Sequence, residues 1–351
     1  MKKYLFVLIL LIVMLGSVPV VMVVTSNNGV IDTQNSTQTT TKTNTEIKSQ
    51  NKPTTAQQFN KNITENVKNQ HFKLLNKDNG KSIEYNDFDF TIYALAYNMP
   101  ISYEKEALKA EAIAIYTYYS FKRETQKRTP NANLMGCDFS YSAKNNNIFY
   151  DKDTLKDRWG KKFADNYALL ETIVSQVLPT VITYKGELIE SVTCDFTVGL
   201  TENGDYIKIK NAPYLQRVAS PFDQYNSKYT TIVKFEDDKM RKILENKYKD
   251  IKLTDNFQEW FSNIKYNASG NVTTISVGDK KLTGKDVKKL FSLPSSAFDI
   301  LFSFEEFIFN VKGSGDFVGM SLYGANEMAK QGSTYKEILL HYYSNVDLTT
   351  I

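Results

Sequence analysis

A long helix-like pattern of apolar residues lies between Met99 and Thr125 (MPISYEKEALKAEAIAIYTYYSFKRET). Seven apolar residues lie there with almost no polar break: Ala107, Leu108, Ala110, Ala112, Ile113, Ala114 and Ile115. A helix that is apolar on most sides is a buried helix. We therefore predict a long buried helix, with Ser102 as its N-cap.

Shorter apolar segments follow, with the spacing of strands or of helices. The spacing predicts strands at Phe88–Ala96, Thr230–Phe235, Ile264–Tyr266 and Val272–Val277. It also predicts strands within Phe298–Val311, separated by a turn at Glu305-Glu306, and a hairpin in Val181–Phe196 that turns at Lys185-Gly186. It predicts helices at Lys156–Val177, Asp238–Tyr248, from Thr283, at Tyr323–Gln331 and at Thr334–Tyr343, and a polar loop at Thr129–Asn147. Mixed strands and helices with several hairpins indicate an α+β fold with antiparallel-rich sheets around the buried helix.

The N-terminal residues form a long uncharged segment. Lys2 and Lys3 precede a run from Tyr4 to Ser26 that is long enough to cross the ~30 Å hydrocarbon core of a bilayer. We predict an uncleaved transmembrane anchor at 1–26 with a cytoplasmic N-terminus. The alternative is a cleaved signal peptide, but Val20–Thr25 offers no A-x-A site. The nearly apolar-free stretch that follows predicts a flexible linker at 27–68 and an extracytoplasmic folded domain at 69–351.

Charge and composition exclude some classes of function. The 351 residues include 43 Lys and Arg and 39 Asp and Glu, and the two signs are interspersed, with a net charge of +4. Nucleic-acid binders usually carry a concentrated basic patch, so we predict no nucleic-acid partner. The two histidines, His71 and His341, lie at the end of the predicted linker and in an amphipathic helix. A Ser-His-Asp or Cys-His catalytic site is therefore not expected.

The two cysteines, Cys137 and Cys194, either pair or remain free thiols, and the sequence does not decide between these alternatives. Two cysteines without clustered histidines do not make a zinc site. We predict no metal site and no cofactor.

The remaining candidate chemistry is that of a carboxyl group. Glu106 lies in the first turn of the predicted buried helix and shares a stripe with Ala110, Ile113 and Thr117. It is therefore expected at the mouth of an apolar groove. Burial would raise the pKa of its carboxyl group, whereas the helix N-terminus would lower it, and the pattern leaves open which effect is larger. It also leaves open that Glu106 only complements the helix dipole.

The segment Glu106–Thr117 (EALKAEAIAIYT) resembles the signature helix of the stage II sporulation protein D family, membrane-anchored enzymes that act on cell-wall glycan. The resemblance implies that Glu106 is the catalytic acid. The family usually has Gln and Arg where this chain has Glu111 and Tyr116.

Two further segments extend the resemblance: residues 201–203 match a T-E-N tripeptide, and Pro213–Asp223 (PYLQRVASPFD) matches a longer motif, in which Gln216 replaces the usual Lys. The resemblance implies substrate-binding roles for Tyr214, Asp223, Thr201 and Glu202. On the residues alone, Tyr214 is equally well a core aromatic residue and Asp223 a turn residue after Pro221.

The segment Val318–Gly324 (VGMSLYG) resembles the closing motif of the family. Several positions depart from the usual residues: Asp316 and Phe317 replace part of a G-H-G, Leu322 replaces a Gln, Pro294 replaces an Arg, and Ser142 and Ala143 stand where some members have metal-binding residues.

The resemblance implies a lytic transglycosylase that cleaves peptide-stripped peptidoglycan strands during engulfment in sporulation. Such an enzyme can work with one carboxylic acid, which protonates the leaving oxygen and then takes a proton from the sugar's own 6-hydroxyl as a 1,6-anhydro ring closes. The implied partner is an amidase of the stage II sporulation protein P type, and the implied location is the mother-cell membrane facing the forespore. The alternative is a non-catalytic glycan-binding protein or amidase enhancer with the same fold.

Overall fold

The computed structural model describes residues 67–351. The predicted anchor at 1–26 and all but the last two residues of the predicted linker at 27–68 lie outside this range. Between Val67 and Ile351, no helix is both long enough and apolar enough to cross a membrane.

The predicted buried helix is present as α4 (Lys105–Arg128), and 13 of its 24 residues are buried. The predicted N-cap is wrong, because the helix begins after Glu104 rather than after Ser102. Pro100 to Tyr103 form a turn, in which Tyr103 N donates to Pro100 O (3.0 Å). The N–H of Glu104 donates instead to the side chain of Asn326, 222 residues away (2.8 Å), so a tertiary contact takes the place of a local cap.

The segment predicted as a strand at Phe88–Ala96 is a helix, α3 (Asp87–Asn98). The side chain of Asn86 caps it by accepting from Asp89 N (2.8 Å), and two acidic residues stand in its first turn. Most of its aromatic and β-branched residues are buried in the same core as α4. Packing on all sides therefore outweighs the strand preference of these residues.

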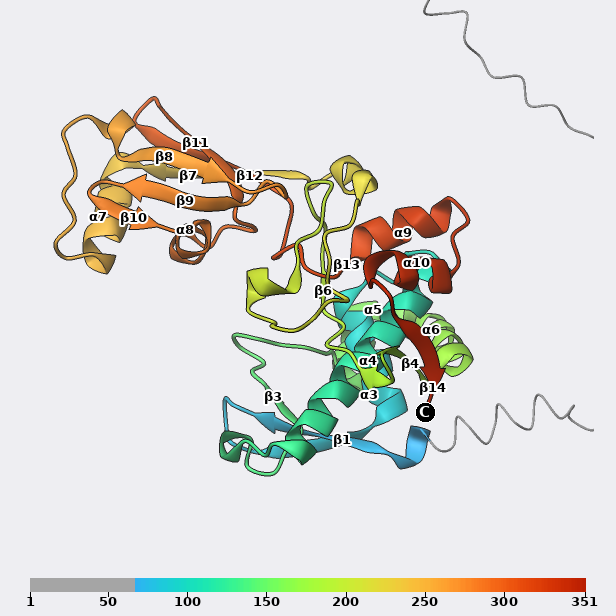
Figure 1. Cartoon of the computed structure of the whole chain (residues 1–351). Helices are drawn as coiled ribbons and strands as arrows, with labels where there is room; N and C mark the ends of the chain where they lie inside the picture. The colour runs from blue at the N-terminus through green and yellow to red at the C-terminus, as the bar shows by residue number, and fades with distance from the viewer. Residues whose placement is uncertain (1–66) are drawn as a thin grey trace, which may run out of the picture. The chain divides into compact units, whose positions relative to one another are not determined.

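Helices and short strands surround α4 (Figure 1). The predicted helix at Lys156–Val177 is two helices, α5 (Lys152–Trp159) and α6 (Phe163–Val177), because Gly160 at φ +50° ends the first. The last two helices, α9 (Leu322–Lys330) and α10 (Tyr335–Tyr342), were both predicted, and α10 begins with a capping box of Thr334 and Glu337.

Three small sheets belong to this first core. β1 (His71–Asn76) pairs with β2 (Ser82–Asn86) in antiparallel fashion and with β3 (Phe139–Tyr141) in parallel, and β3 lies inside the stretch predicted as a polar loop. β4 (Thr180–Tyr184) pairs with β5 (Glu187–Leu188) in the predicted hairpin and with β14 (Asp347–Thr350). β6 (Thr193–Cys194) pairs in parallel with β13 (Met320–Ser321).

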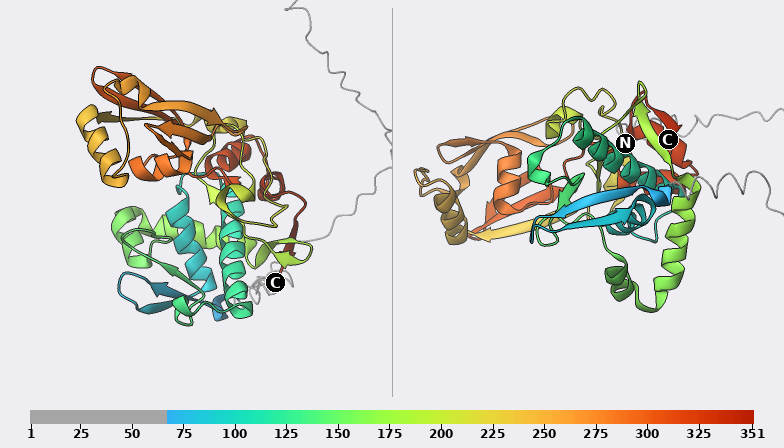
Figure 2. Two further views of the ribbon diagram at one scale, coloured as in Figure 1. Left: turned by 60° about the vertical axis from the view of Figure 1, so that its left-hand side comes forward. Right: turned by 90° about the horizontal axis from the view of Figure 1, so that it is seen from below.

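A second core lies between residues 230 and 312 (Figures 1 and 2). All strand pairs around it are antiparallel. One sheet has the order β11-β12-β7, and the other has the order β10-β9-β8. Their bounds are β7 Thr230–Glu236, β8 Phe261–Tyr266, β9 Val272–Val277, β10 Lys280–Leu282, β11 Ala297–Ser303 and β12 Glu306–Lys312, with α7 at Asp237–Lys247 and α8 at Gly284–Phe291. The strands and both helices predicted here are confirmed to within three residues at each end, and β10 was not predicted. The described chain is thus a mixed α+β protein with predominantly antiparallel sheets.

Candidate active site

The carboxylate of Glu106, in the first turn of α4, is held by two donors. Its Oε1 accepts from Lys109 Nζ (2.7 Å), and its Oε2 accepts from the backbone N–H of Tyr335, the first residue of α10 (2.8 Å). The side chain is 31% exposed. Both carboxylate oxygens are therefore occupied by groups that favour the charged form.

The pKa of Glu106 is lowered. Partial burial raises it, but the hydrogen bond from Lys109, the N–H of Tyr335 and the charge of Lys109 together outweigh that effect. The sequence did not show whether burial or the groups that favour the charged form have the larger effect. The contacts show that the second effect is larger, so Glu106 is ionised at neutral pH.

The stripe that was expected to form an apolar groove beside Glu106 is closed. Ala110, Ile113 and Thr117 are each 0% exposed. The hydroxyl of Thr117 accepts from Ile182 N of β4 (2.9 Å), so this face of α4 packs against β4. It is a packing surface of the core.

Glu111 lies on another side of the same helix. It follows Glu106 by five positions, which corresponds to about 140° around the helix axis. Its side chain is 0% exposed, and its Oε1 accepts from the amide of Asn98, the last residue of α3 (2.9 Å). Its Oε2 has no hydrogen-bond partner in the described part of the chain.

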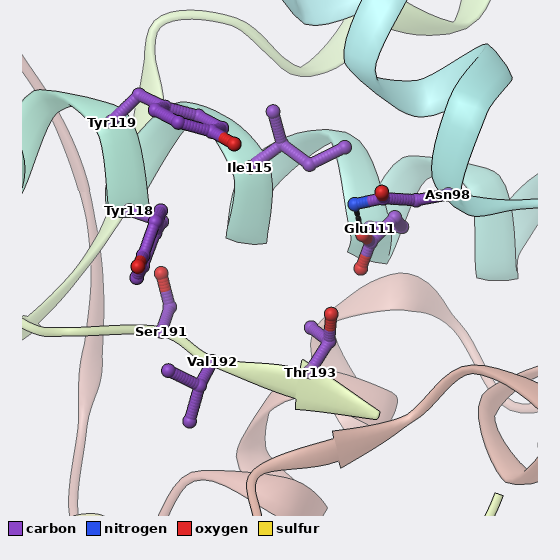
Figure 3. A pocket seen from close by; sticks show the side chains of 8 residues that line it. All are labelled: Asn98, Glu111, Ile115, Tyr118, Tyr119, Ser191, Val192 and Thr193. Atoms are coloured by element: carbon purple, nitrogen blue, oxygen red, sulfur yellow. Dashed lines mark hydrogen bonds between the residues drawn. The ribbon is translucent and has the colours of Figure 1, made fainter. Parts of the chain in front are cut away.

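Glu111 lines a cavity of about 190 Å³ between α4 and the segment Ser191–Thr193 (Figure 3). Figure 3 shows Asn98, Ile115 and Tyr119 on one side of this space, with Ser191, Val192 and Thr193 facing them. The full lining consists of Asn98, Glu111, Ile115, Tyr118, Tyr119, Ser191, Val192 and Thr193. We call this space the Glu111 cavity.

Burial raises the pKa of Glu111 to about 8, and the hydrogen bond from Asn98 opposes this effect only in part. The carboxyl group is therefore mostly protonated at neutral pH and can donate a proton. From the sequence, Glu111 was only a departure from the usual residue of the family. A signal was present, because an acidic residue inside an apolar helical run must be paired or neutral.

A wider cavity of about 550 Å³ adjoins the first, since Asn98 lines both. Thr193 of β6 lines the Glu111 cavity, and Asp195, the residue after β6, lines the wider cavity. Tyr103 and Tyr323 contribute aromatic rings to the wider cavity. The two spaces form neighbouring parts of one region.

Two of the four predicted substrate-binding residues are bound by backbone groups. Tyr214 is 9% exposed, and its hydroxyl accepts from Glu190 N (3.1 Å). Thr201 is 0% exposed, and its hydroxyl donates to Gln216 O and accepts from Val218 N. Both side chains therefore hold neighbouring segments of backbone together.

Asp223 and Glu202 are buried carboxylates with several donors each. Asp223 accepts from both the N–H and the hydroxyl of Thr197 (2.7 Å each) and from Ser321 Oγ (2.7 Å). Glu202 pairs with Arg217 (2.9 Å) and accepts from the amides of two asparagines in the β8–β9 turn, Asn267 and Asn271. Neither residue, nor Tyr214 or Thr201, lines the Glu111 cavity. None of these four side chains is hydrogen-bonded to Glu106, whose partners in the described residues are Lys109 and Tyr335.

Comparisons with known proteins identify relatives of this chain. No protein-family profile matches the chain. The stage II sporulation protein D of Bacillus amyloliquefaciens is 29% identical over 264 residues, which cover 74% of this chain and 73% of the relative. The protein of the same name from Bacillus subtilis (strain 168) is 26% identical over 264 residues, or 74% of each chain. These two relatives support the resemblance to the stage II sporulation protein D family. An uncharacterized protein of Brachyspira hyodysenteriae is also similar, with 27% identity over 269 residues, which cover 76% of this chain and 67% of the relative.

Several residues that depart from the usual stage II sporulation protein D pattern line the two cavities or lie in the core. Glu111 forms the cavity described above, and Pro294 and Leu322 line the wider cavity. Tyr116 is 0% exposed and packs edge-on against Phe72, so it belongs to the core. The departures therefore include residues that line both cavities.

Three other departures have local roles. Asp316 pairs with Lys288 (2.8 Å). Phe317 is 0% exposed at φ +64°, and Gln216 donates to Pro213 O (2.9 Å). These three side chains stabilise turns and the core.

Cysteine and metal chemistry can be described only from Val67 onward. Cys137 and Cys194 are both buried free thiols, and burial raises the pKa of each. In this range no three His, Cys, Asp or Glu side chains come together as a metal site would require. The absence of a metal stays a prediction.

Proposed function

We propose that this protein is a sporulation lytic transglycosylase that cleaves peptide-stripped strands of peptidoglycan and leaves 1,6-anhydro ends. The names of its Bacillus relatives support a role in sporulation. The observation that carries the proposed chemistry is the Glu111 cavity, in which a carboxyl group stands beside hydroxyl-bearing side chains. Polar side chains with a few apolar neighbours suit a saccharide, and cleavage of a glycosidic bond needs a proton donor.

One carboxyl group is sufficient for this reaction, because the sugar's own hydroxyl replaces water as the nucleophile. A hydrolase would need a second carboxylate placed across the scissile bond. The family resemblance implies that the acid is Glu106. Its ionised state in the free protein means that it would serve as an acid only if bound glycan displaced Lys109 or excluded water.

The activity is tested with the full-length protein purified in detergent. Peptide-stripped glycan strands are incubated with it, and the products are analysed by mass spectrometry. Anhydro ends are lighter than reducing ends by one water, so the two outcomes are distinct. Release of anhydro ends supports the proposal, and products with reducing ends, or no products, contradict it.

We also propose that the domain is anchored in the membrane through residues 1–26 and cooperates with an amidase that removes the peptides first. The uncharged run behind Lys2 and Lys3 motivates the anchor. The protein is then expected to fractionate with membranes and to keep residues 1–26. A mature N-terminus mapped after Thr25 would contradict the anchor.

A second candidate function is favoured by the contacts of Glu106. A carboxylate with both oxygens engaged by Lys109 and Tyr335 resembles a structural residue more than a proton donor. A non-catalytic glycan-binding protein or amidase enhancer would keep such a contact. Protein that binds glycan, makes no anhydro ends and increases the rate of a wall amidase would support this second function.

A further inference from the structure

We propose that the second core carries an accessory saccharide site, apart from the two cavities described above, which keeps the protein on its glycan. The site is a cavity of about 250 Å³ that we call the Tyr266 pocket. Its lining includes two tyrosines, Tyr229 and Tyr266, and one ion pair, Asp299 with Lys312. The inference rests on the proposed function only for the class of polymer that is bound.

Tyr266, the last residue of β8, offers an aromatic face that is already held in position. The residue is 47% exposed. Its hydroxyl donates to Asp299 Oδ1 on β11 (2.7 Å), which lies beside β8 in the second core (Figure 1). Sugar rings pack their C–H faces on aromatic rings, and a ring that is fixed in advance loses less entropy on binding. Tyr266 is therefore suited to stack on one sugar.

Asp299 and Lys312 present an acceptor and a donor next to this ring. Lys312 Nζ lies 3.6 Å from Asp299 Oδ2, and both side chains are about half exposed. This separation is longer than a normal hydrogen bond, and the bond from Tyr266 uses the other carboxylate oxygen. Two neighbouring sugar hydroxyls can therefore bridge the pair, one donating to Oδ2 and the other accepting from Nζ.

The opposite wall of the pocket is fixed by contacts to the first core. Gly270, in the β8–β9 turn, packs on Val198 so closely that an added Cβ would lie 3.0 Å from Val198 Cγ2. Glu202 accepts hydrogen bonds from the amides of Asn267 and Asn271, which hold the same turn. The pocket is therefore formed before a ligand arrives, as binding sites usually are.

The charges and the size of the pocket favour a neutral sugar over a charged ligand. The ion pair brings one charge of each sign, so a singly charged group would be attracted by one partner and repelled by the other. Hydroxyl groups satisfy both partners at once. A volume of about 250 Å³ is below the ~300–1,000 Å³ of sites for larger ligands, so the pocket suits a single sugar unit of a strand.

The Tyr266 pocket lies outside the candidate active site but next to it along the chain. None of its lining residues lines the Glu111 cavity or the wider cavity. Tyr229 directly follows Lys228, and Lys312 directly precedes Gly313, and these two neighbours do line the wider cavity. Glycan held at Tyr266 would therefore stay near the active site without filling it, which raises its effective concentration there.

The test measures binding of the full-length protein, purified in detergent, to insoluble peptide-stripped glycan by cosedimentation on ice. Tyr266→Ala removes the aromatic face, and Lys312→Gln removes the ammonium group. Each should weaken binding about 3- to 10-fold, as expected for one aromatic contact or one charge-assisted hydrogen bond. The matched controls are Tyr225→Ala and Lys234→Gln, two exposed residues outside the pocket, and both should bind as the wild type does.

Cleavage of short soluble strands separates the Tyr266 pocket from the active site. Strands of a few sugars gain nothing from a second contact, so all four variants should cleave them at the wild-type rate. Release of anhydro ends from the insoluble glycan should fall in Tyr266→Ala and Lys312→Gln only. Thermal unfolding shows whether Tyr266→Ala is folded, and the more exposed Lys312→Gln tests the pocket independently of that result.

The outcomes distinguish this inference from the proposed function. Wild-type protein that binds glycan but forms no anhydro ends refutes the proposed activity, whereas weaker binding of Tyr266→Ala and Lys312→Gln still supports the pocket. Wild-type binding in both variants overturns the pocket, and so does a wild type that does not bind the insoluble glycan. Weaker binding seen only with glycan that still carries its peptides would assign the pocket to the peptide and overturn the saccharide site.

Discussion

Glu106 and Glu111 differ in protonation although they are the same residue type on one helix. Glu106 faces the N-terminus of α10 and Lys109, and both lower the pKa of its carboxyl group. Glu111 faces Asn98 and a ring of neutral side chains, and burial raises its pKa to about 8. Environment alone therefore separates a fixed negative charge from a neutral carboxyl group.

The raised pKa of Glu111 predicts a pH-dependent stability. A folded-state pKa of about 8, against an ordinary value of 4.5, means that the unfolded chain releases this proton first as the pH rises. The stabilising contribution is complete below about pH 4.5, declines above it and is lost by about pH 8, with a total on the order of 5 kcal/mol at most.

The measurement is the free energy of unfolding in urea between pH 5 and 9 for the wild type and for Glu111→Gln. The wild type should lose stability relative to the variant as the pH rises, because all other titrating groups are common to both proteins. Parallel curves for the two proteins would show that Glu111 ionises normally.

Sequence alone identified α4 and its burial but not the environment of Glu111. The acidic residue between Ala110 and Ala112 could have been recognised as a charge inside an apolar run. Its partner Asn98 could not have been recognised in this way. Phe88–Ala96 was predicted as a strand, and a strand would place Asn98 differently from the helix α3 that the structure contains. The site depends on a contact between two helices that local pattern does not encode.

At the scale of elements, Asp223 holds three segments together. It lies in a short 3₁₀ helix, Pro221–Tyr225, and accepts hydrogen bonds from Thr197 and from Ser321, the N-cap of α9. Gly324 of α9 approaches so closely that an added Cβ would lie 2.9 Å from Asp223 Oδ1 and 2.2 Å from Tyr342 Oη. These contacts fix the start of α9, which follows Leu322 of the wider cavity wall.

This arrangement predicts that Asp223→Asn destabilises the fold. The carboxylate accepts one bond from a backbone N–H and two from hydroxyls, whereas the amide of Asn offers a single acceptor oxygen, so its NH₂ must face a buried hydroxyl that has to turn and accept. We expect a loss of roughly 2–4 kcal/mol in the free energy of unfolding. At a temperature where the variant is folded, its affinity for glycan should equal that of the wild type. A variant of normal stability that no longer binds glycan would instead support the substrate-binding role implied by the resemblance.

Local sequence signals identified elements best where caps and turns are strong. Thr283 with Asp286, and Thr334 with Glu337, form capping boxes at the start of two helices that were predicted there. The antiparallel strands of the second core follow their alternating pattern. The errors at α3 and at the start of α4 arise where burial and the distant Asn326 outweigh local preference.

At the scale of the whole described chain, the cavities are assembled from distant segments. Asn98 and Tyr103 flank the start of α4, Asp195 follows β6, and Tyr323 lies in α9. The parallel pairing of β6 with β13 brings the second and third of these segments next to each other. Such long-range pairing is what sequence pattern predicts least well, so the region was not foreseen as one site.

The adjoining cavities predict that glycan binding extends beyond Glu111. Tyr103→Ala removes an aromatic face from the wider cavity without touching the residues that line the Glu111 cavity. If a strand occupies both spaces, the variant should raise KM about 5- to 10-fold and leave kcat nearly unchanged, because the lost contact is the same in the ground and transition states. Tyr225→Ala is the control, since Tyr225 is 70% exposed and outside both cavities. Equal KM values for Tyr103→Ala and the control would mean that the strand does not pass through the wider cavity.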